Sequence, residues 1–261
     1  MIITKIKSLL RPCYYTIQQK RRVHRSRPYF DRIKNKHEGK RGFVIGNGPS
    51  LKMEDLDKLV NDVTIASNKI YMAFNATSWR PDYFTIVDGL VWEKVQSDLT
   101  TLQLRPIIPS YLHEFQIPSE TFRHLGSAAD AYLANSSINF SNDLSNGIFG
   151  GYTVTFQNLQ LAVHLGLNPI YIIGCDHFYS GEDRIEQGKP TTHNSESNHF
   201  IPNYRTAGEI VNPAPIAKMN AAYTVAATYA EQTGIRIFNA TRGGHLDAFP
   251  RIEFDAIRFH Q

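Results

Sequence analysis

The sequence predicts an α/β fold built on a doubly wound, mainly parallel sheet with helices on both faces. Short apolar runs alternate along the chain with longer helix-like segments, the pattern of strands joined by crossover helices. Several of these runs end in glycine or in a polar residue, as strands do at the ligand-binding edge of a parallel sheet. The 261 residues, of which 42% are hydrophobic and 20% charged, have the composition of a globular domain.

The first predicted strand, residues 43–45, leads into the loop Gly46-Asn47-Gly48-Pro49-Ser50 and then into helix-like sequence. A loop that joins a strand to a helix start favours an anion, because the free N–H groups of the helix point toward it. The glycines let the backbone approach a ligand, and Ser50 either caps the helix or donates to a phosphate oxygen. The spacing matches neither the dinucleotide fingerprint nor the P-loop, so a plain turn is an equally good interpretation.

Polar side chains follow the first three predicted strands, which cover residues 43–45, 63–66 and 82–88. Asn47, Asn68 and Asp88 stand at these ends. In a parallel sheet the carboxyl ends of the strands share one edge, so the three residues are candidates for one binding site. Asn and Asp also favour turns after strands, which is the simpler reading for each residue taken alone.

The later chain continues the alternation. Helices are predicted over 90–104, 153–166 and 216–233, and strands over 169–174 and 235–239. Residues 106–109 read as a short edge strand or a crossover, and residues 109–150 as a lid or small subdomain. The strand over 169–174 delivers Cys175-Asp176-His177-Phe178-Tyr179 into a polar loop over 180–213, and a loop of this length is usually functional or disordered.

The charge is concentrated at the N-terminus. Residues 1–41 hold 13 Lys or Arg but only two acids, a net charge of +11, whereas the whole chain carries +4. We therefore expect a basic extension, residues 1–41, before a catalytic domain, residues 42–261. Apolar residues among the cations favour docking on an anionic membrane or on a partner, and a solvated helix packed on the domain is the alternative. No nucleic-acid module is recognisable.

Two cysteines and the lack of a long apolar run favour a reducing, cytoplasmic setting, with the protein peripheral on the inner face of the membrane.

No zinc or hydrolase motif is present. Asp55-Leu56-Asp57 resembles a metal-binding Asp-x-Asp motif, but it falls in a helix and is interpreted as a solvated face. What remains suits group transfer from a nucleotide donor, which needs a phosphate cradle, donors for the leaving phosphate and a base. Tyr179, Tyr204 and Arg205 are candidate donors, and His199 or His193 is the candidate base. No metal or other cofactor is expected.

With these residues in hand, the chain resembles the bacterial sialyltransferases of glycosyltransferase family 42. It is more similar still to a group of polysaccharide-locus proteins related to the archaeal 6-hydroxymethylpterin diphosphokinases. The likeness covers roughly residues 42–245 and depends on four motifs in order. They are Ile45-Gly46-Asn47-Gly48-Pro49-Ser50-Leu51, Ser67-Asn68-Lys69-Ile70-Tyr71, Gly174-Cys175-Asp176-His177-Phe178-Tyr179 and His199-Phe200-Ile201-Pro202-Asn203.

The resemblance implies a Rossmann-like domain that binds a CMP-activated nonulosonic or Kdo-type sugar and transfers it with inversion, without a metal. It implies nucleotide-binding roles for residues of the first three motifs: Gly46, Asn47, Gly48, Ser50, Asn68, Lys69, Gly174 and Asp176. It places Asp88 near the donor and gives Tyr179 and Tyr204 to the leaving phosphate. The histidine motif departs from the family: His199 matches its first histidine, but its last is replaced by Asn203, which cannot act as a base.

Three hypotheses stay open at this stage. The first is a glycosyltransferase that acts on a cell-surface glycan or glycolipid acceptor, in lipopolysaccharide or capsule synthesis. The second is a diphosphokinase of the pterin type, which needs ATP and a divalent metal. The third is a non-catalytic nucleotide-binding protein of polysaccharide assembly. Family likeness also favours a homo-oligomer, and no nucleic-acid partner is expected.

Overall fold

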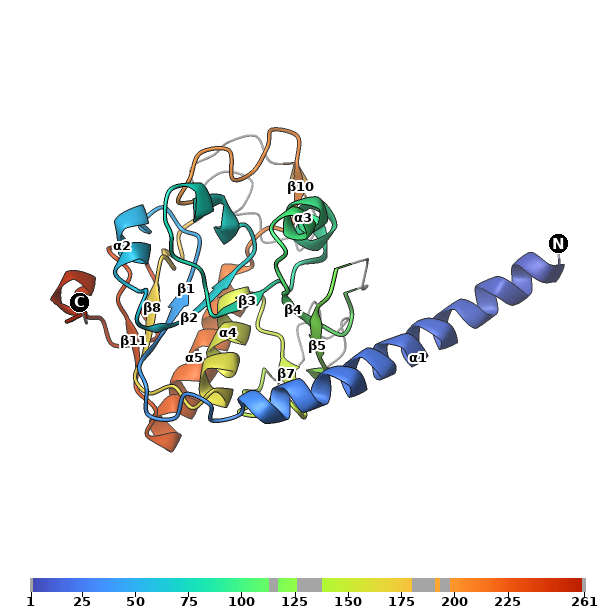
Figure 1. The fold of residues 1–261 in the computed structure, drawn as a ribbon, viewed down its shortest axis with the longest axis horizontal. Helices are drawn as coiled ribbons and strands as arrows, with labels where there is room; N and C mark the ends of the chain where they lie inside the picture. The colour runs from blue at the N-terminus through green and yellow to red at the C-terminus, as the bar shows by residue number, and fades with distance from the viewer. Residues whose placement is uncertain (1, 113–116, 126–137, 180–190, 193–197, 260–261) are drawn as a thin grey trace.

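The computed structural model describes residues 2–112, 117–125, 138–179, 191–192 and 198–259. Its helices are α1 (Ile2–Ile33), α2 (Met53–Asp57), η1 (Ile70–Asn75), α3 (Gly89–Thr101), α4 (Val154–His164), α5 (Ile216–Thr233) and η3 (Phe254–Ala256). Its strands are β1 (Gly42–Ile45), β2 (Val63–Ser67), β3 (Tyr83–Thr85), β4 (Ile107–Pro109), β5 (Glu120–Phe122), β6 (His124–Leu125), β7 (Ile148–Phe149), β8 (Ile170–Ile173), β9 (Thr191–Thr192), β10 (Ile210–Val211) and β11 (Ile237–Asn239). Figure 1 shows their arrangement.

Seven strands form one sheet in the order β11-β8-β1-β2-β3-β4-β5, and every neighbouring pair is parallel. From β1 the chain winds outward to β5 on one side, then crosses back to place β8 and β11 on the other side. The winding direction therefore reverses between β1 and β8. In open α/β sheets a ligand binds at such a reversal, outside the carboxyl ends of the strands.

Helices cover both faces of the sheet, as the sequence predicted. Successive side chains of β1 point to opposite faces, so Val44 joins one core cluster while Phe43 and Ile45 join the other. The first cluster packs α4, α5 and the end of α1 against the sheet, and the second packs α2, η1 and α3. Strands buried on both faces explain the continuous apolar runs of the sequence.

Two sequence expectations in the middle of the chain are wrong. Residues 107–109 are neither an edge strand nor a crossover, because β4 lies between β3 and β5. The segment 109–150 is not simply a lid, because its residues 120–122 form β5, the last strand of the main sheet. Strands of three residues carry too little periodicity to be recognised before their pairing is known. The rest of the segment includes the small parallel pair of β6 and β7.

The second half of α1 packs against β5 and the neighbouring loop. Phe30 and Ile33 are buried, and so are Arg22 and Ser26. Arg22 donates to the carbonyl oxygens of Leu112 (2.7 Å) and Ser110 (3.1 Å). This half of the helix is thus part of the domain core, whereas the first half extends beyond the sheet (Figure 1). Among the described residues, none of the helices has the length and apolar character needed to cross a bilayer.

Candidate functional site

The loops after β1 and β8 meet at the reversal of the sheet. The backbone of Gly46 and Gly48 lies against residues 174–176, and a Cβ at Gly48 would come within 2.0 Å of Asp176 Oδ2. A Cβ at Gly46 would meet the carbonyl oxygen of Gly174 at 2.3 Å. The two glycines are therefore required for close packing of these loops. A ligand contact by Gly46, Gly48 or Gly174 stays a prediction.

Asp176 joins the two loops through Ser50. Its carboxylate accepts from Ser50 Oγ (2.8 Å) and from the Ser50 N–H (3.2 Å), and its carbonyl oxygen accepts from the His245 N–H (2.7 Å). Burial raises the pKa of Asp176, while the hydrogen bonds from Ser50 act against this rise. The predicted helix cap at Ser50 is wrong, because α2 begins only at Met53 and is five residues long. The β1 loop therefore does not lead directly into a helix N-terminus that could bind an anion.

Asn47 and Asn68 lie together at the ends of β1 and β2, as the sequence predicted. Asn47 Nδ2 donates to the carbonyl oxygen of Ser67 (3.2 Å). Asn68 has a left-handed backbone (φ 57°), and its N–H donates to the Thr85 carbonyl oxygen on β3 (3.1 Å). Within the described part of the chain, Asn47 Oδ1, Asn68 Oδ1 and Ser67 Oγ are buried without a hydrogen-bond partner. Buried polar atoms are nearly always paired, so this cluster is prepared for a ligand or for water.

The segment 198–204 covers these two asparagines. The Phe200 N–H donates to the Asn47 carbonyl oxygen (3.0 Å), which places His199 beside the β1 loop. The rings of His199 and Tyr204 are stacked, with 3.9 Å between centroids and 8° between planes. The Tyr204 hydroxyl accepts from the Lys69 N–H (3.3 Å). The structure thus brings Asn47 and Lys69 together with His199 and Tyr204, which follow them by more than 100 positions in the sequence.

Lys69 is held by the segment that follows. Its ammonium donates to the Tyr204 carbonyl oxygen (2.7 Å) and lies 3.4 Å from both carboxylate oxygens of Glu209. Glu209 also pairs with Lys94 on α3 (3.0 Å). Burial acts to raise the pKa of Glu209, but the Thr206 N–H and the two lysines outweigh it and lower that pKa. Lys69 is therefore a positioned cation beside Asn68.

Asp88 is occupied in a different way. Its carboxylate caps α3 by accepting from the N–H groups of Leu90 (2.8 Å) and Val91 (3.3 Å). It also accepts from Asn212 Nδ2 (3.0 Å). The interpretation of Asp88 as a turn residue thus describes its contacts in this structure. A bound sugar donor could contact only the lone pairs of the carboxylate that these hydrogen bonds leave unused.

His177, which the sequence analysis did not select, lies on the β8 loop next to Tyr179. It adopts a left-handed backbone (φ 51°), and its Nε2 lies 2.6 Å from Asn220 Oδ1. Its Nδ1 is buried without a partner among the described residues. Burial lowers the pKa of His177, with Asn220 acting in the opposite direction. The ring of Tyr179 meets it edge-on at 6.3 Å. His177 is therefore a neutral imidazole near neutral pH.

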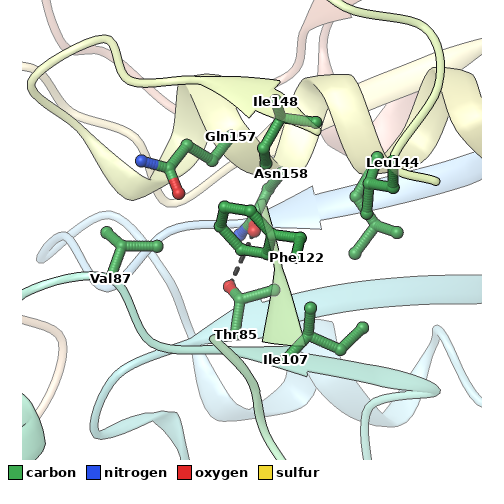
Figure 2. A pocket seen from close by; sticks show the side chains of 9 residues that line it. Thr85, Val87, Ile107, Phe122, Leu144, Ile148, Gln157 and Asn158 are labelled. Carbon is green, nitrogen blue, oxygen red and sulfur yellow. Dashed lines mark hydrogen bonds between the residues drawn. The ribbon is translucent and has the colours of Figure 1, made fainter. Parts of the chain in front are cut away.

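A narrow space lies between α4 and strands β3 to β5 (Figure 2). It is too narrow to hold a water molecule. Thr85 Oγ1 donates to Asn158 Oδ1 (2.7 Å) inside it, whereas Gln157 Oε1 has no partner in the described chain. Gln157, Asn158 and Gln160 are three buried amides in one helix, which is an unusual feature. These amides are the signal by which the sequence could have drawn attention to Gln157.

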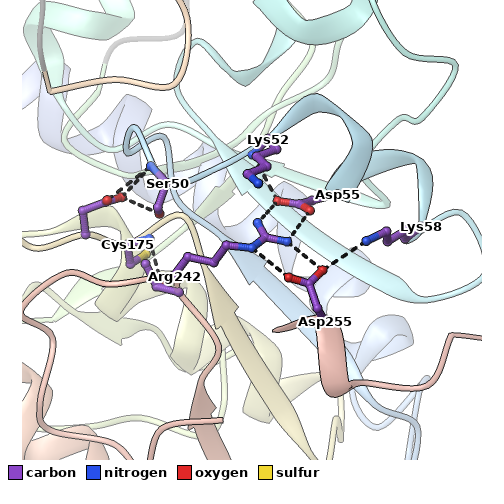
Figure 3. A network of polar contacts seen from close by, with 9 residues as sticks. Ser50, Lys52, Asp55, Lys58, Cys175, Arg242 and Asp255 are labelled. Carbon is purple, nitrogen blue, oxygen red and sulfur yellow. Dashed lines mark hydrogen bonds and ion pairs between the residues drawn. The ribbon is translucent and has the colours of Figure 1, made fainter. Parts of the chain in front are cut away.

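On the other side of the β1 loop, the polar groups are paired (Figure 3). Arg242 donates both ends of its guanidinium to Asp55 (2.6 and 2.9 Å) and also bonds Asp255 (3.1 Å). Asp55 is 3% exposed, so the prediction of a solvated face is wrong for this residue. Asp57 is exposed and accepts from Thr77 Oγ1. The Asp-x-Asp pattern is therefore structural.

The remaining predicted residues are placed as follows. His193 lies outside the described residues, and Arg205 is half-buried next to Tyr204. Cys175 is buried, and desolvation raises the pKa of its thiol to about 12, so it stays protonated. Among the described residues, no three His, Cys, Asp or Glu side chains gather in a way that could hold a metal ion.

A known protein family matches this chain. The profile of the family described as 6-hydroxymethylpterin diphosphokinase MptE-like matches residues 16–182. The chain belongs to the MptE-like family. This match includes β1, the reversal of the sheet and the β8 loop, and it ends before the segment that carries His199 and Tyr204.

The fold is also similar to a solved structure, the MAf glycosyltransferase from Magnetospirillum magneticum AMB-1, with a TM-score of 0.53 and 13% identity. The alignment covers 91% of this chain but 39% of that protein, so this MptE-like chain spans less than half its length. At this identity the likeness establishes the fold alone. No curated protein matches the sequence.

Proposed function

We propose that this chain is a glycosyltransferase that moves a sugar from a nucleotide donor to a cell-surface glycan or glycolipid. The proposed donor is a CMP-linked nonulosonic or Kdo-type sugar, transferred with inversion and without a metal. The observation that carries the proposal is the set of unpartnered buried acceptors at the reversal of the sheet: Asn47 Oδ1, Ser67 Oγ and Asn68 Oδ1. The glycosyltransferase fold of the structural neighbour supports it.

The chemistry of this set favours a ligand rich in hydroxyl and amino groups. Asn47 Nδ2 is already used by the Ser67 carbonyl oxygen, so its Oδ1 remains as an acceptor. Amide oxygens accept from the hydroxyls of a ribose or sugar and from an exocyclic amine of a base. A triphosphate offers acceptor oxygens instead, which the two amide oxygens of this set cannot satisfy. Lys69 and Lys94 together outnumber the Glu209 carboxylate that pairs with both, which leaves a net positive charge to face a single phosphate.

The proposed reaction gives different roles to the stacked side chains of His199 and Tyr204. His199 accepts the proton of the acceptor hydroxyl, whose oxygen attacks the anomeric carbon. The bond from that carbon to the phosphate oxygen breaks, and CMP leaves with the electron pair. The Tyr204 hydroxyl and the Lys69 ammonium stabilise the charge that develops on the leaving phosphate. The stack of His199 on Tyr204 fixes the ring orientation that such proton transfer requires.

A second function is favoured by the family name, because a 6-hydroxymethylpterin diphosphokinase transfers a diphosphate from ATP. That reaction uses metal-bound phosphates. The described carboxylates near the site are already engaged: Asp88 caps α3, Asp176 binds Ser50, and Glu209 pairs with two lysines. Their arrangement fits a magnesium–ATP complex less well than it fits a nucleotide sugar.

Thermal unfolding with a panel of nucleotides tests the two functions. The purified chain is heated with CMP, CDP, UDP, GDP, or ATP plus magnesium. A ligand at 100 times its dissociation constant stabilises by about 2.7 kcal/mol. Stabilisation by CMP that is lost in Asn47→Ala is the expected result. A shift only with ATP and magnesium would favour the diphosphokinase, and no shift with any nucleotide would make the β1 loop a structural turn.

A further inference from the structure

A strongly basic surface lies on α1 and is not used by the proposed reaction. Over its second half, α1 buries one side against β5 and exposes the other. The exposed side carries five cations: Lys20, Arg21, Arg25, Arg27 and Arg32. Asp31 is the one acidic residue in this half, and it lies 3.9 Å from Arg27. We refer to these five residues as the basic face.

In the first half of α1, apolar residues occupy the helical positions that line up with the basic face. At 3.6 residues per turn, positions 2, 6, 9, 13 and 17 fall on the same side of the helix as the basic face. They are Ile2, Ile6, Leu9, Cys13 and Ile17. The positions that pack on the domain, 22, 26, 30 and 33, fall on the opposite side. Ile17 is 49% exposed. Ile17, the described member of this stripe, therefore does not serve the packing of α1 on its own domain.

We propose that α1 docks this protein on an anionic lipid bilayer, with the basic face against lipid phosphates and the apolar stripe in the interface. Apolar residues on one side of a helix and many cations define segments that lie in the headgroup region. The net charge of +11 over residues 1–41, against −7 over the rest of the chain, orients the molecule with α1 toward the lipids. The buried Arg22, bonded to Leu112 and Ser110, fixes α1 to the domain, so docking also fixes the domain.

The test is sedimentation of the full chain with phosphatidylcholine vesicles, with and without phosphatidylglycerol, at low and high salt. No nucleotide is present, so the result is independent of the proposed reaction. Binding to the anionic vesicles alone, weakened by salt, is the expected result. Replacing an exposed cation should weaken binding about five-fold, so Lys20→Gln with Arg21→Gln should give roughly 25-fold. Ile17→Ser should give about ten-fold.

Matched controls keep the docking proposal falsifiable. Arg105→Gln removes an exposed cation outside α1, and Val60→Ser removes an aliphatic side chain that is 58% exposed. Both should bind vesicles as the unmodified chain does. Equal losses in the controls, no binding to anionic vesicles, or tighter binding to a DNA duplex than to vesicles would each overturn the proposal. Unchanged thermal unfolding of the α1 variants shows that the fold is kept.

Discussion

Buried polar groups are paired on one side of the β1 loop and left unpaired on the other. On one side Asp55, Arg242 and Asp255 form a network in which the charges are paired. On the other, Asn47 and Asn68 keep buried oxygens without partners in the described chain. A buried acceptor left unpaired costs about 1–3 kcal/mol, and such a cost persists where a ligand recovers it. The difference distinguishes side chains that are paired within the fold from side chains with an oxygen left for a ligand or for water.

The largest effect should come from His199, on the side proposed to bind ligand. Replacing a general base lowers turnover by about 10²–10⁴-fold, so we expect His199→Ala to lose activity in that range. Its thermal unfolding and its response to CMP should change little. Turnover is measured as release of CMP from the activated sugar, with the exposed His24→Ala as control. Full activity in His199→Ala would remove this residue from the mechanism.

Asp55→Ala should have the next largest effect, and on stability rather than on ligand binding. It leaves the Arg242 guanidinium without its main partner in a site where Asp55 is 3% exposed. Breaking a buried ion pair costs about 3–5 kcal/mol, and we expect the lower end because Asp255 remains bonded to Arg242. Urea unfolding gives the value, and Glu54→Ala, exposed on the same helix, is the control. Equal stability of the two variants would show that the paired network contributes nothing.

Neighbouring positions on α4 sharpen the comparison within one helix. Asn158→Leu deprives the buried Thr85 hydroxyl of its 2.7 Å acceptor and should cost about 1–3 kcal/mol. Gln157→Leu removes an unpartnered oxygen and should be neutral or stabilise the unliganded chain by about 1 kcal/mol. Both are measured by urea unfolding. If Gln157→Leu destabilises as much as Asn158→Leu, the unpartnered atoms carry no information about function.

The smallest predicted effect is on the pH dependence of stability, and it comes from His164 in the core. Burial lowers the pKa of His164 below its ordinary 6.5, with the Phe30 carbonyl and Asp143 acting in the opposite direction. The folded chain then binds fewer protons than the unfolded chain just below pH 6.5. Stability is therefore complete above this pH and falls as the pH drops through the folded pKa.

His164→Gln should reduce this acid sensitivity without abolishing it, because burial also lowers the pKa of His37 and His177. Urea unfolding on both sides of pH 6.5 measures the change. An unchanged pH dependence would mean that His164 does not titrate in this range.

The sequence predicted the fold well because long elements carry strong periodicity. The helix over 216–233 was predicted with its observed bounds, and Gly234 ends it in a left-handed conformation. The meeting of Asn47 and Asn68 also followed from the rule that the carboxyl ends of parallel strands share one edge. The sequence could not predict which distant residues contact one another. Nothing in the residues near Asp55 predicts Arg242, which is 187 positions away. The cover of residues 198–204 over Asn47 likewise depends on a backbone contact that has no sequence signature.

The ends of the main sheet have a consequence for how copies of this chain can associate. On the β5 side, Ser26 Oγ of α1 accepts from the Thr121 N–H (2.9 Å). On the β11 side, Asn239 exchanges hydrogen bonds with Pro250 and Ile252. Open strand edges are templates for aggregation, and here each terminal strand is screened by its own chain. In the part of the chain that the structure describes, both margins of the main sheet are therefore poor templates for pairing with a strand of a neighbouring copy.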